Sequence, residues 1–525
     1  IVRDVKPGGV FLINCQWTPE ELSHHLAASE KRYIAKNNVQ LYTINAIDLA
    51  IEIGMGKRTN TILQSAFFAL AKVMPSEQAI QFMKDAATKS YLKKGQDIVD
   101  MNHKAIDIGA TAYKKIDVPA DWADAQDEAD TRELQGRPEV VKMVKEVMEP
   151  IGRMDGDSLP VSAFAGEHVD GSFEHGAAAY EKRGVAVTVP HWNEVTCVQC
   201  NQCAYVCPHA TIRPFALTDE EAAAAPESAK LVDIKAGKGK GKYKYTMAVS
   251  PLDCMGCGVC IGVCPTKSLT MVPQDQEAAQ QDTFDYCVAK VSEKEDMASV
   301  NSVKDSQFKK PLLEFSGSCA GCAETSYARL ITQLFGEKMF ISNATGCSSI
   351  WGGTASISPY TTNKESGHGP AWINSLFEDN AEHGLGMQIG YETVRANLIT
   401  KVEALKGKNA ELDAVIDNFL ATKNNTKAND EPAKALVAAL EACGCDEAKE
   451  ILKDKQYLAK KSFWIFGGDG WAYDIGYGGL DHVLASGHDV NVMVFDTEMY
   501  SNTGGQASKA SNIGEVCQFA AAGKE

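Results

Sequence analysis

Short apolar runs alternate with helical patterns over the first 120 residues. Residues 10–14 (Val-Phe-Leu-Ile-Asn) predict a strand, and a helix is predicted to begin after Thr18. Thr18 can cap this helix, Glu21 can return the hydrogen bond, and Pro19 suits the first helical position. A second pair follows, with a strand at residues 39–44 and a helix at residues 48–53. Repeated strand and helix indicate an α/β layer.

The centre of the chain has a different pattern. Residues 121–193 are polar and interrupted by Gly and Pro, which indicates a connecting segment with modest helical pieces, notably at residues 138–148. Residues 194–275 hold the densest cysteine motifs. Within them, residues 218–245 consist largely of Ala, Glu, Lys and Gly without a core pattern, so we expect an insertion loop there.

Alternation of strand and helix returns over residues 300–525. Strands are predicted at residues 463–466 and 490–495, with a helical pattern at residues 473–486 between them. Residues 395–461 are rich in Ala, Lys, Leu and Glu and predict a helical insertion with a turn near Asn424. We therefore expect an α/β multidomain protein, divided into residues 1–120, 121–193, 194–275 and 300–525.

Length and composition agree with a modular globular protein. A chain of 525 residues is too long for one hydrophobic core, and 44% hydrophobic with 23% charged residues is ordinary for folded domains. The formal net charge of −17 argues against nucleic acid as a main partner, because phosphate binding requires clustered Lys and Arg. The one basic run, at residues 235–244, alternates with Gly and is expected to be a solvated loop.

The sequence also predicts where the protein works and that it is incomplete. No run of about 18 apolar residues is present to span a membrane, and no signal peptide opens the chain, so we expect a cytoplasmic protein without a membrane partner. The sequence begins at Ile1 rather than Met and stops at Glu525, where we expect an unfinished helix. We therefore expect it to be a fragment of a longer protein.

Two cysteine runs of identical spacing give the strongest chemical signal in the sequence. Each is C-x2-C-x2-C-x3-C-P, a spacing that binds four-iron clusters, and the fourth cysteine of each run ligates the other cluster. Gly256, Gly258 and Gly262 would let backbone amides approach the cluster sulfides. On this rule one [4Fe–4S] cluster takes Cys197, Cys200, Cys203 and Cys264, and the other takes Cys254, Cys257, Cys260 and Cys207.

The other cysteines leave more than one interpretation open. Zinc sites also use C-x2-C pairs, although zinc does not explain two complete runs of four that end in Cys-Pro. Cys319, Cys322 and Cys347 form a third set, which by spacing alone fits zinc or an iron–sulfur cluster equally. The remaining cysteines have no partner spacing and are expected to be buried structural thiols: Cys15, Cys287, Cys443, Cys445 and Cys517.

A glycine-rich turn after a predicted strand suits a diphosphate with a divalent metal. In Gly468-Asp469-Gly470 the glycines let backbone amides approach phosphates, and Asp469 offers a hard oxygen ligand to Mg2+. A Gly-Asp-Gly sequence taken alone is more often a simple turn. Thr497, after the next predicted strand, and the carbonyl of Met499 could complete the metal site, and residues 502–506 could cover the diphosphate. The combination resembles the thiamine diphosphate signature, except that Thr497 stands where Asn is usual.

Several motifs in one order resemble a known family. They are the twin cysteine runs and residues 180–184 (YEKRG), 318–325 (SCAGCAET), 367–372 (GHGPAW), 378–382 (EDNAE) and 500–506 (YSNTGGQ). On these motifs the chain resembles the pyruvate:ferredoxin (flavodoxin) oxidoreductases of the single-chain, homodimeric type, over nearly its whole length. The resemblance implies that this chain lacks the family's N-terminal domains and its extreme C-terminus.

The resemblance implies both a fold and a reaction. The expected parts are an α/β region that contributes to coenzyme A binding, a small connecting domain, a bacterial two-cluster ferredoxin-like α+β domain and a thiamine diphosphate-binding α/β domain. The implied enzyme is an oxidoreductase of anaerobic metabolism that converts pyruvate and coenzyme A to acetyl-CoA and CO2. Electrons would leave one at a time through three [4Fe–4S] clusters to ferredoxin or flavodoxin.

The resemblance also assigns residues to cofactors. Cys319, Cys322 and Cys347 would hold the third cluster, whose fourth cysteine would lie beyond the end of the chain. Mg2+ would be held by Asp469 and Thr497 with the Met499 carbonyl. The residues expected to contact thiamine diphosphate are Glu324, Cys347, Gly468, Asp469, Gly470, Trp471, Thr497, Glu498, Met499, Tyr500, Ser501 and Asn502.

Five further residues have expected or disputed roles. Asn502, beside the substrate carbon, would be the catalytic residue. Asn60 and Asn102 are candidates for coenzyme A contacts, with a cap or loop role as the alternative. His368 and His383 could act as bases, but a structural or phosphate-contacting role is at least as common for such histidines.

Three other functions stay open at this point. The same chemistry could act on another 2-oxo acid, since the substrate pocket and the glutamate that activates the aminopyrimidine would lie in the absent domains. An iron–sulfur subunit of a larger redox complex would explain the cysteines, but such a subunit needs no diphosphate site. A zinc-dependent scaffold would be colourless.

Overall fold

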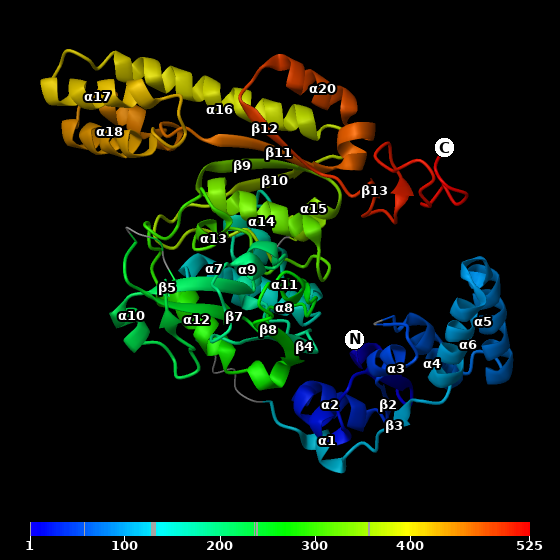
Figure 1. The fold of residues 1–525 in the computed structure, drawn as a ribbon. Coiled ribbons are helices and arrows are strands. Elements are labelled where there is room, and N and C mark those ends of the chain that lie inside the picture. Colours follow the sequence, from blue (N-terminus) through cyan, green and yellow to red (C-terminus); the bar gives the residue numbers. More distant parts are fainter. Residues whose placement is uncertain (1, 57, 128–132, 236, 238–239, 355–356) are drawn as a thin grey trace. The chain divides into compact units, whose positions relative to one another are not determined.

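The computed structural model describes residues 2–56, 58–127, 133–235, 237, 240–354 and 357–525. The chain divides into two compact units, Ile1–Glu133 and Leu134–Glu525 (Figure 1), which are described separately. Both units combine α-helices with β-strands, so the predicted α/β character is confirmed. Among the described residues, no helix combines the length and hydrophobicity needed to cross a bilayer.

A small sheet forms the centre of the first unit. β1 (Val10–Asn14) pairs in parallel with β2 (Gln40–Ile44), and the short β3 (Lys114–Lys115) runs antiparallel to β2. Both predicted strands are confirmed. The predicted capping box is also present, since the Glu21 N–H donates to Thr18 Oγ1 at 3.3 Å and the Thr18 N–H donates to Glu21 Oε2 at 2.8 Å.

The described residues of the first unit also form six α-helices. They are α1 (Pro19–His25), α2 (Ala28–Lys36), α3 (Ala46–Glu52), α4 (Asn60–Ala71), α5 (Ser76–Tyr91) and α6 (Gln96–Gly109). The helix predicted at residues 48–53 is α3, which begins two residues earlier because the Asn45 side chain caps it. α4 and α6 cross closely at Gly109, where a Cβ would lie 2.2 Å from the Ile62 carbonyl oxygen. Glycine is therefore required at this crossing.

The connecting segment opens the second unit. α7 (Pro138–Met143) continues into a π-helical turn (Val144–Met148) and then α8 (Glu149–Gly152), so the predicted helical pieces are confirmed. Apolar side chains from these turns, including Val144 and Val147, pack with Ala177 in a small core. The segment therefore has a hydrophobic centre of its own, followed by short 3-10 turns.

Two antiparallel sheets carry the cysteine-rich region. β4 (Thr188–Trp192) pairs with β8 (Leu269–Pro273), and β7 (Lys244–Val249) lies between β5 (Ile212–Leu217) and β6 (Val232–Asp233). The short helices α9 (Gln202–Val206) and α11 (Val259–Gly262) each carry the third cysteine of one run. α12 (Gln280–Lys290) and α13 (Val303–Ser306) follow.

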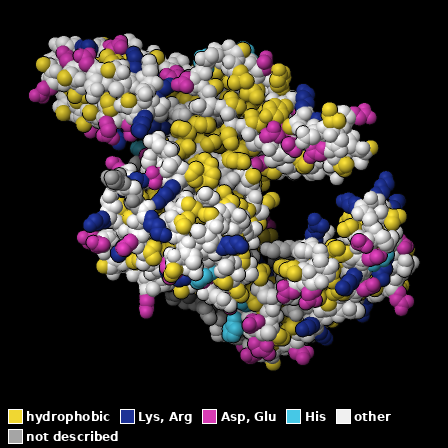
Figure 2. All heavy atoms as spheres, in the orientation of Figure 1, with side chains coloured by type: hydrophobic (Ala, Val, Ile, Leu, Met, Phe, Trp, Pro, Cys, Tyr) yellow, Lys and Arg dark blue, Asp and Glu magenta, His cyan; other side chains and the backbone are white. Residues whose placement is uncertain are grey.

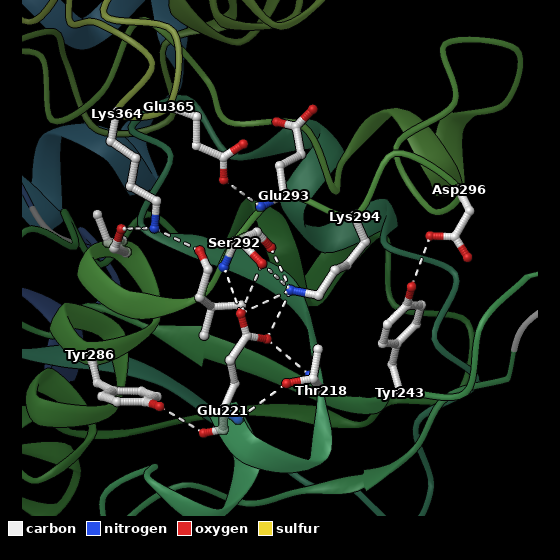
Figure 3. Close-up of polar contacts among 12 residues, drawn as sticks. Thr218, Glu221, Tyr243, Tyr286, Ser292, Glu293, Lys294, Asp296, Lys364 and Glu365 are labelled. Atoms are coloured by element: carbon white, nitrogen blue, oxygen red, sulfur yellow. Dashed lines mark hydrogen bonds and ion pairs between the residues drawn. The ribbon is translucent and has the colours of Figure 1, made fainter.

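Residues 218–245 differ from the expected loop. They contain α10 (Asp219–Ala223), β6 and the start of β7, and Tyr245 is fully buried with its hydroxyl donating to Asn201 Oδ1 at 2.8 Å. The expectation was wrong because isolated apolar residues in this segment pack across strands, where no periodic pattern is needed. Figure 3 shows how Glu221 of α10 anchors the segment: its carboxylate accepts from the Ser292 N–H at 2.9 Å and from Lys294 Nζ at 2.8 Å.

A four-stranded parallel sheet forms the last α/β region. Its order is β10 (Ala371–Ser375), β9 (Met339–Ala344), β11 (Ser462–Gly468) and β12 (Val490–Phe495). Ile465 and Phe466 of β11 pack into two different hydrophobic clusters, as expected for a strand buried on both faces. The helices α14 (Ala323–Phe335), α15 (Cys347–Gly352) and α20 (Tyr477–Ser486) belong to this region, and a π-helical turn (Gly470–Ile475) precedes α20. The predicted strands and the helical pattern between them are confirmed.

The predicted helical insertion is also present. α16 (Asn380–Glu403), α17 (Ala410–Thr422), α18 (Asp430–Cys443) and α19 (Asp446–Leu452) share one core that includes Ile416, Phe419 and Leu436. Figure 1 shows α17 and α18 beside the far half of α16. α16 begins before the predicted insertion because its first half covers the sheet, where a Cβ on Gly384 would lie 2.5 Å from Ile465.

The last residues of the chain correct another expectation. After β13 (Met499–Tyr500) and β14 (Gln506–Ala507), residues 508–525 form turns and isolated bridges rather than a helix. Gly514 and Gly523 adopt positive φ angles of 83° and 98°, which end regular structure. Lys524 Nζ donates to the carbonyls of Ser508 and Ser511 at 2.6 and 2.7 Å and fixes the turn.

The surface agrees with the acidic composition. On the face in view in Figure 2, Lys and Arg side chains are interspersed with Asp and Glu and do not merge into one basic stripe.

Candidate functional site

The first cysteine set lines one pocket. Three cysteines of the first run and the last cysteine of the second run border it: Cys197, Cys200, Cys203 and Cys264. Backbone amides already point at the sulfurs, since the Ser268 N–H donates to Cys264 Sγ at 3.1 Å and the Gln199 N–H to Cys197 Sγ at 3.4 Å. The fold thus brings the two runs together in the crossed order that a two-cluster domain requires.

The second set likewise combines three cysteines of one run with the last cysteine of the other. Burial, together with the nearby Cys207 and Cys257 thiols, raises the pKa of the Cys254 thiol to about 12. The pKa of Cys260 is raised even more, by burial first and then by the same neighbours. Cys207 of the first run therefore lies among the cysteines of the second run.

The loops of the two runs share an unusual backbone. Gln199 and Asn201 have φ angles of 58° and 60°, and Gly256 and Gly258, at the matching places of the second run, have 63° and 76°. Left-handed backbone is disfavoured for non-glycine residues, so the first loop needs side-chain support.

That support comes from two buried amides. Gln199 Nε2 donates to the Asp233 carbonyl at 2.9 Å, and Asn201 Nδ2 donates to the Lys304 carbonyl at 2.7 Å. Sequence reasoning missed both residues, although superposing the two runs would have placed them opposite the glycines. Ala210 and Lys267 lie at matching positions, three residues after the last cysteine of each run, and both also adopt left-handed backbone, with φ angles of 55° and 52°.

The third cysteine set lies beside the second. Burial raises the pKa of the Cys347 thiol, and the nearby Cys322 and Cys319 thiols add to this rise. A Cβ on Gly321 would lie 3.6 Å from Cys257 Cβ, so the 319–322 turn touches the loop of the second run. Among the described residues, no three His, Cys, Asp or Glu side chains converge closely enough to hold one metal ion. A four-iron cluster instead distributes its thiolates over separate irons.

A second pocket lies at the carboxyl ends of the parallel strands. The loops after β9, β11 and β12 border it together, because the carboxyl ends of parallel strands meet at one edge of the sheet. Its lining includes eleven of the twelve residues expected to contact thiamine diphosphate: Glu324, Cys347, Gly468, Asp469, Gly470, Trp471, Thr497, Met499, Tyr500, Ser501 and Asn502. The others are Thr345, Gly346, Ser348, Phe377 and Thr503.

The three oxygen groups expected to hold Mg2+ converge at this pocket. Thr497 Oγ1 lies 3.1 Å from Asp469 Oδ1 and 3.0 Å from the Met499 carbonyl oxygen. Asp469 is 1% exposed, and its other oxygen accepts from Ser508 Oγ at 2.5 Å. A carboxylate, a hydroxyl and a carbonyl in one group suit a hard cation. Sequence reasoning missed Ser508, which has no motif around it.

Glu324 and Cys347 reach the pocket from two different helices, α14 and α15. The Trp351 indole N–H donates to Glu324 Oε2 at 2.8 Å, while burial raises the pKa of the Glu324 carboxyl and the charge of Asp469 also raises it. Cys347 Sγ lies 3.2 Å from Ser501 Oγ. The third cysteine set therefore reaches the wall of the strand-end pocket.

Five candidate residues lie elsewhere. Glu498 is not in the pocket lining, and its carboxylate accepts from Asn512 Nδ2 at 3.1 Å. In the first unit, Asn60 is exposed at the start of α4, whereas Asn102 is buried and donates to the Ile98 carbonyl at 2.8 Å within α6. His383 Nδ1 hydrogen-bonds the buried Ser342 hydroxyl at 2.8 Å, which is a structural contact. His368 lies in the loop before β10, where its carbonyl accepts from the Asn363 N–H.

Comparison with known proteins agrees with this layout. Residues 2–112 match a family model described as pyruvate ferredoxin/flavodoxin oxidoreductase, and residues 196–268 match a 4Fe-4S dicluster domain. Residues 127–186 match EKR, a domain of unknown function. A pyruvate-flavodoxin oxidoreductase of Klebsiella pneumoniae is 47% identical over 530 residues, which cover 100% of this chain and 44% of that protein.

Two further relatives extend the comparison. A pyruvate:ferredoxin oxidoreductase of Moorella thermoacetica is 48% identical over 535 residues, covering 100% of this chain and 45% of the relative. Over its whole length, this chain resembles the pyruvate:ferredoxin and pyruvate-flavodoxin oxidoreductases. A mitochondrial pyruvate dehydrogenase [NADP(+)] of Euglena gracilis is 42% identical over 99% of the chain and 29% of its own length. The chain thus spans less than half the length of these oxidoreductases.

Proposed function

We propose that this chain is the electron-transfer and thiamine diphosphate-binding part of an enzyme that oxidatively decarboxylates pyruvate with coenzyme A. The products would be acetyl-CoA and CO2, and the electrons would pass through three [4Fe–4S] clusters to ferredoxin or flavodoxin. One observation carries the proposal: Cys347 lines a pocket with hard oxygen ligands, it lies near Cys319 and Cys322, and the turn at Gly321 touches the second cysteine run. A diphosphate site and a path for single electrons are therefore continuous.

The strand-end pocket fits thiamine diphosphate with Mg2+. Asp469, Thr497 and the Met499 carbonyl would hold the metal, and the backbone from Gly468 to Gly470 would face the diphosphate. Thr497 offers a hydroxyl oxygen where an amide oxygen is usual, and its present contacts place that oxygen between the other two groups. Bound thiamine diphosphate would supply the nucleophilic carbon that attacks the 2-oxo group.

The surrounding side chains would orient and protect the reacting groups. Asn502 borders the pocket and remains the proposed catalytic residue at the substrate. Glu324, fixed by the Trp351 N–H, would contact the thiazolium side together with Cys347. Phe377 and Trp471 line the pocket with apolar surface, which excludes water from the reacting carbon.

The cysteine sets would hold a chain of three clusters for electron transfer. One cluster would be held by Cys197, Cys200, Cys203 and Cys264, the next by Cys207, Cys254, Cys257 and Cys260, and the third by Cys319, Cys322 and Cys347 with one ligand from outside these residues. The order in space runs from the strand-end pocket through the third set to the second and then the first. Contacts of Asn60 and Asn102 with coenzyme A and assembly as a homodimer stay predictions.

An anaerobic dye-reduction assay on the complete protein tests the function. Reduction that requires both pyruvate and coenzyme A is expected, and Asp469→Asn should weaken Mg2+-dependent cofactor binding by roughly 100-fold or more. Asp481→Asn, on the exposed face of α20, is the matched control and should retain activity. Activity with a different 2-oxo acid alone would contradict the substrate. No activity in a preparation replete with cofactors would leave an electron carrier as the function.

A further inference from the structure

Arg329 is a buried cation without an anionic partner. It lies on α14, seven residues after the N-cap residue Cys322, and is 2% exposed. Among the described residues, no carboxylate lies within ion-pair distance of its guanidinium. The burial of an uncompensated charge is costly, so the site must gain something from it.

All four hydrogen bonds of this guanidinium end on neutral oxygens. Nε donates to the Cys207 carbonyl at 3.0 Å, and one terminal nitrogen donates to the Tyr205 carbonyl at 2.5 Å. The other terminal nitrogen donates to the side-chain oxygens of Gln333 at 2.7 Å and Gln307 at 3.1 Å. The positive charge is thus held against the backbone of the first cysteine run without being neutralised.

The neighbouring Arg213 provides a contrast. It is also buried, but its guanidinium donates to Glu314 Oε2 at 2.5 Å, so its charge is paired. Of these two buried arginines, only Arg329 therefore places an unpaired positive charge near Cys207. In a medium of low dielectric constant such a charge acts over several ångströms with little screening.

We propose that Arg329 raises the reduction potential of the [4Fe–4S] cluster that Cys207 would ligate, relative to the potential of the cluster that Cys197 would ligate. The inference rests on the proposed function, since it requires those clusters. Reduction adds one negative charge to a cluster, and a fixed cation nearby stabilises the reduced form. The middle cluster would then hold an electron readily between the strand-end pocket and the outer cluster. Arg329 is a positioning residue that acts through the cluster.

Redox titration of the cluster-loaded complete protein, followed by electron paramagnetic resonance, tests this inference. Arg329→Met should lower the midpoint potential of one cluster. The expected shift corresponds to a tenfold or larger change in the oxidised-to-reduced ratio of that cluster, which is 59 mV for one electron. Arg329→Lys should restore most of the potential because it keeps the charge. Arg395→Met is the matched control: Arg395 is equally buried and donates to neutral oxygens of Leu458, Lys423 and Asn429, but within the helical insertion.

Each result has a defined meaning. An unshifted potential in Arg329→Met with normal cluster content would overturn the inference, and so would an Arg329→Lys potential as low as that of the Met variant. If neither Arg329→Met nor Arg329→Gln retains the cluster, Arg329 is a structural support and tuning is wrong. Absence of cluster signals in the unchanged protein would overturn the proposed function as well.

A separate observation concerns Cys443 and Cys445. The sequence predicted both as buried thiols, but Cys443 is exposed, Cys445 is partly exposed, and their Sγ atoms lie 2.8 Å apart. Gly444 between them adopts φ 62° and ends α18, while Cys445 precedes α19. Leu440 and Ala448, on either side, are fully buried, so the two thiols are held together by packed helices.

We infer that Cys443 and Cys445 form a dithiol that exchanges with low-molecular-weight disulfides. The Cys443 thiolate attacks one sulfur of the disulfide and releases one thiol, and the Cys445 thiolate then displaces the second thiol. Two cysteine thiols lose two protons and two electrons, and the reagent gains them as two thiols. The Sγ separation needs to shorten only to the S–S bond length of about 2.05 Å. A bridge that closes so small a loop is readily reduced again.

Peptide mass analysis after anaerobic treatment with oxidised glutathione tests this site. The tryptic peptide of residues 435–449 should become lighter by two hydrogen atoms and return to its first mass with dithiothreitol. Cys445→Ser should instead keep glutathione on Cys443. The buried Cys287 and Cys517 are internal controls that should stay reduced. A stable glutathione adduct in the unchanged protein, or no change in this peptide, would overturn the inference.

Discussion

At the scale of single residues, backbone conformation decides which side chains the cysteine loops accept. The second run places Gly256 and Gly258 at positive φ, whereas the first run places Gln199 and Asn201 there and supports them with buried hydrogen bonds. The same left-handed turn is thus formed in one run by glycines and in the other by Gln and Asn residues whose side chains are hydrogen-bonded. The glycine turn leaves no room for a side chain, because a Cβ on Gly256 would lie 2.9 Å from the Thr188 carbonyl oxygen.

Gly256→Ala should therefore damage the second cluster site. Left-handed backbone costs a non-glycine residue about 1–2 kcal/mol, and the contact with Thr188 adds to this cost. We expect the iron and sulfide content of the reconstituted protein to fall by up to the share of one cluster. Gly262→Ala is the control, because nothing lies within 4 Å of its added Cβ and its φ is not positive. Equal iron content in the two variants would contradict the steric argument.

At the scale of elements, short helices are fixed by polar contacts at their ends rather than by propensity. α10 spans only five residues, yet Thr218 and Glu221 close its first turn and the Glu221 carboxylate also binds Lys294 (Figure 3). Burial opposes the charge on Glu221, but the hydrogen bonds from Lys294, Ser292 and Thr218 hold its pKa at about 2. The network therefore ties the insertion to residues 292–294.

Glu221→Gln should loosen this attachment. Loss of the charge-assisted hydrogen bonds should cost about 1 kcal/mol in a partly exposed site, or roughly fivefold faster amide exchange at residues 219–223 and 292–294. Because the folded pKa lies below the ordinary value of 4.5, the stabilisation is present above pH 4.5 and is lost as the pH falls through about 2. The difference from the unchanged protein should thus be equal at pH 7 and pH 5, as measured by hydrogen exchange.

Glu220→Gln provides the comparison for that experiment. Glu220 is exposed on the same helix turn, and its replacement should leave exchange at residues 292–294 unchanged. Similar exchange rates in the two variants would show that the contacts of Glu221 do not hold the insertion.

At the scale of the whole molecule, the chain has separate cores. The first unit contains two hydrophobic clusters made only of its own residues, including Ile34 and Ile62, and the second unit contains the rest. Because no described core cluster draws residues from both units, each unit should unfold as its own cooperative transition.

Paired core substitutions test this independence. Ile34→Ala in the first unit and Ile416→Ala in the helical insertion each remove a fully buried side chain and should cost about 2–5 kcal/mol. In calorimetry of the complete protein, Ile34→Ala should lower only one transition and Ile416→Ala only another. A common shift of both transitions in either variant would contradict separate unfolding.

The sequence by itself determined the features that depend on spacing along the chain. The strands at residues 10–14 and 490–495 follow from their own apolar runs, and the Thr18 capping box follows because Thr18 and Glu21 lie three residues apart. The cysteine runs and the strand-end motif likewise identified the candidate ligands. Residues 218–245 and the end of the chain were mispredicted, since single apolar residues and positive-φ glycines carry no periodic signal.

Only the tertiary structure decided features that depend on distant contacts. It supported Gln199 and Asn201 in left-handed backbone, placed Trp351 and Ser508 against Glu324 and Asp469, and held the uncompensated charge of Arg329 against the first cysteine run. It also exposed Cys443 and Cys445, which the sequence predicted as buried. The physical reason is common to all of these: burial, charge compensation and side-chain support are set by groups far apart in the sequence, and only packing brings those groups within hydrogen-bond distance.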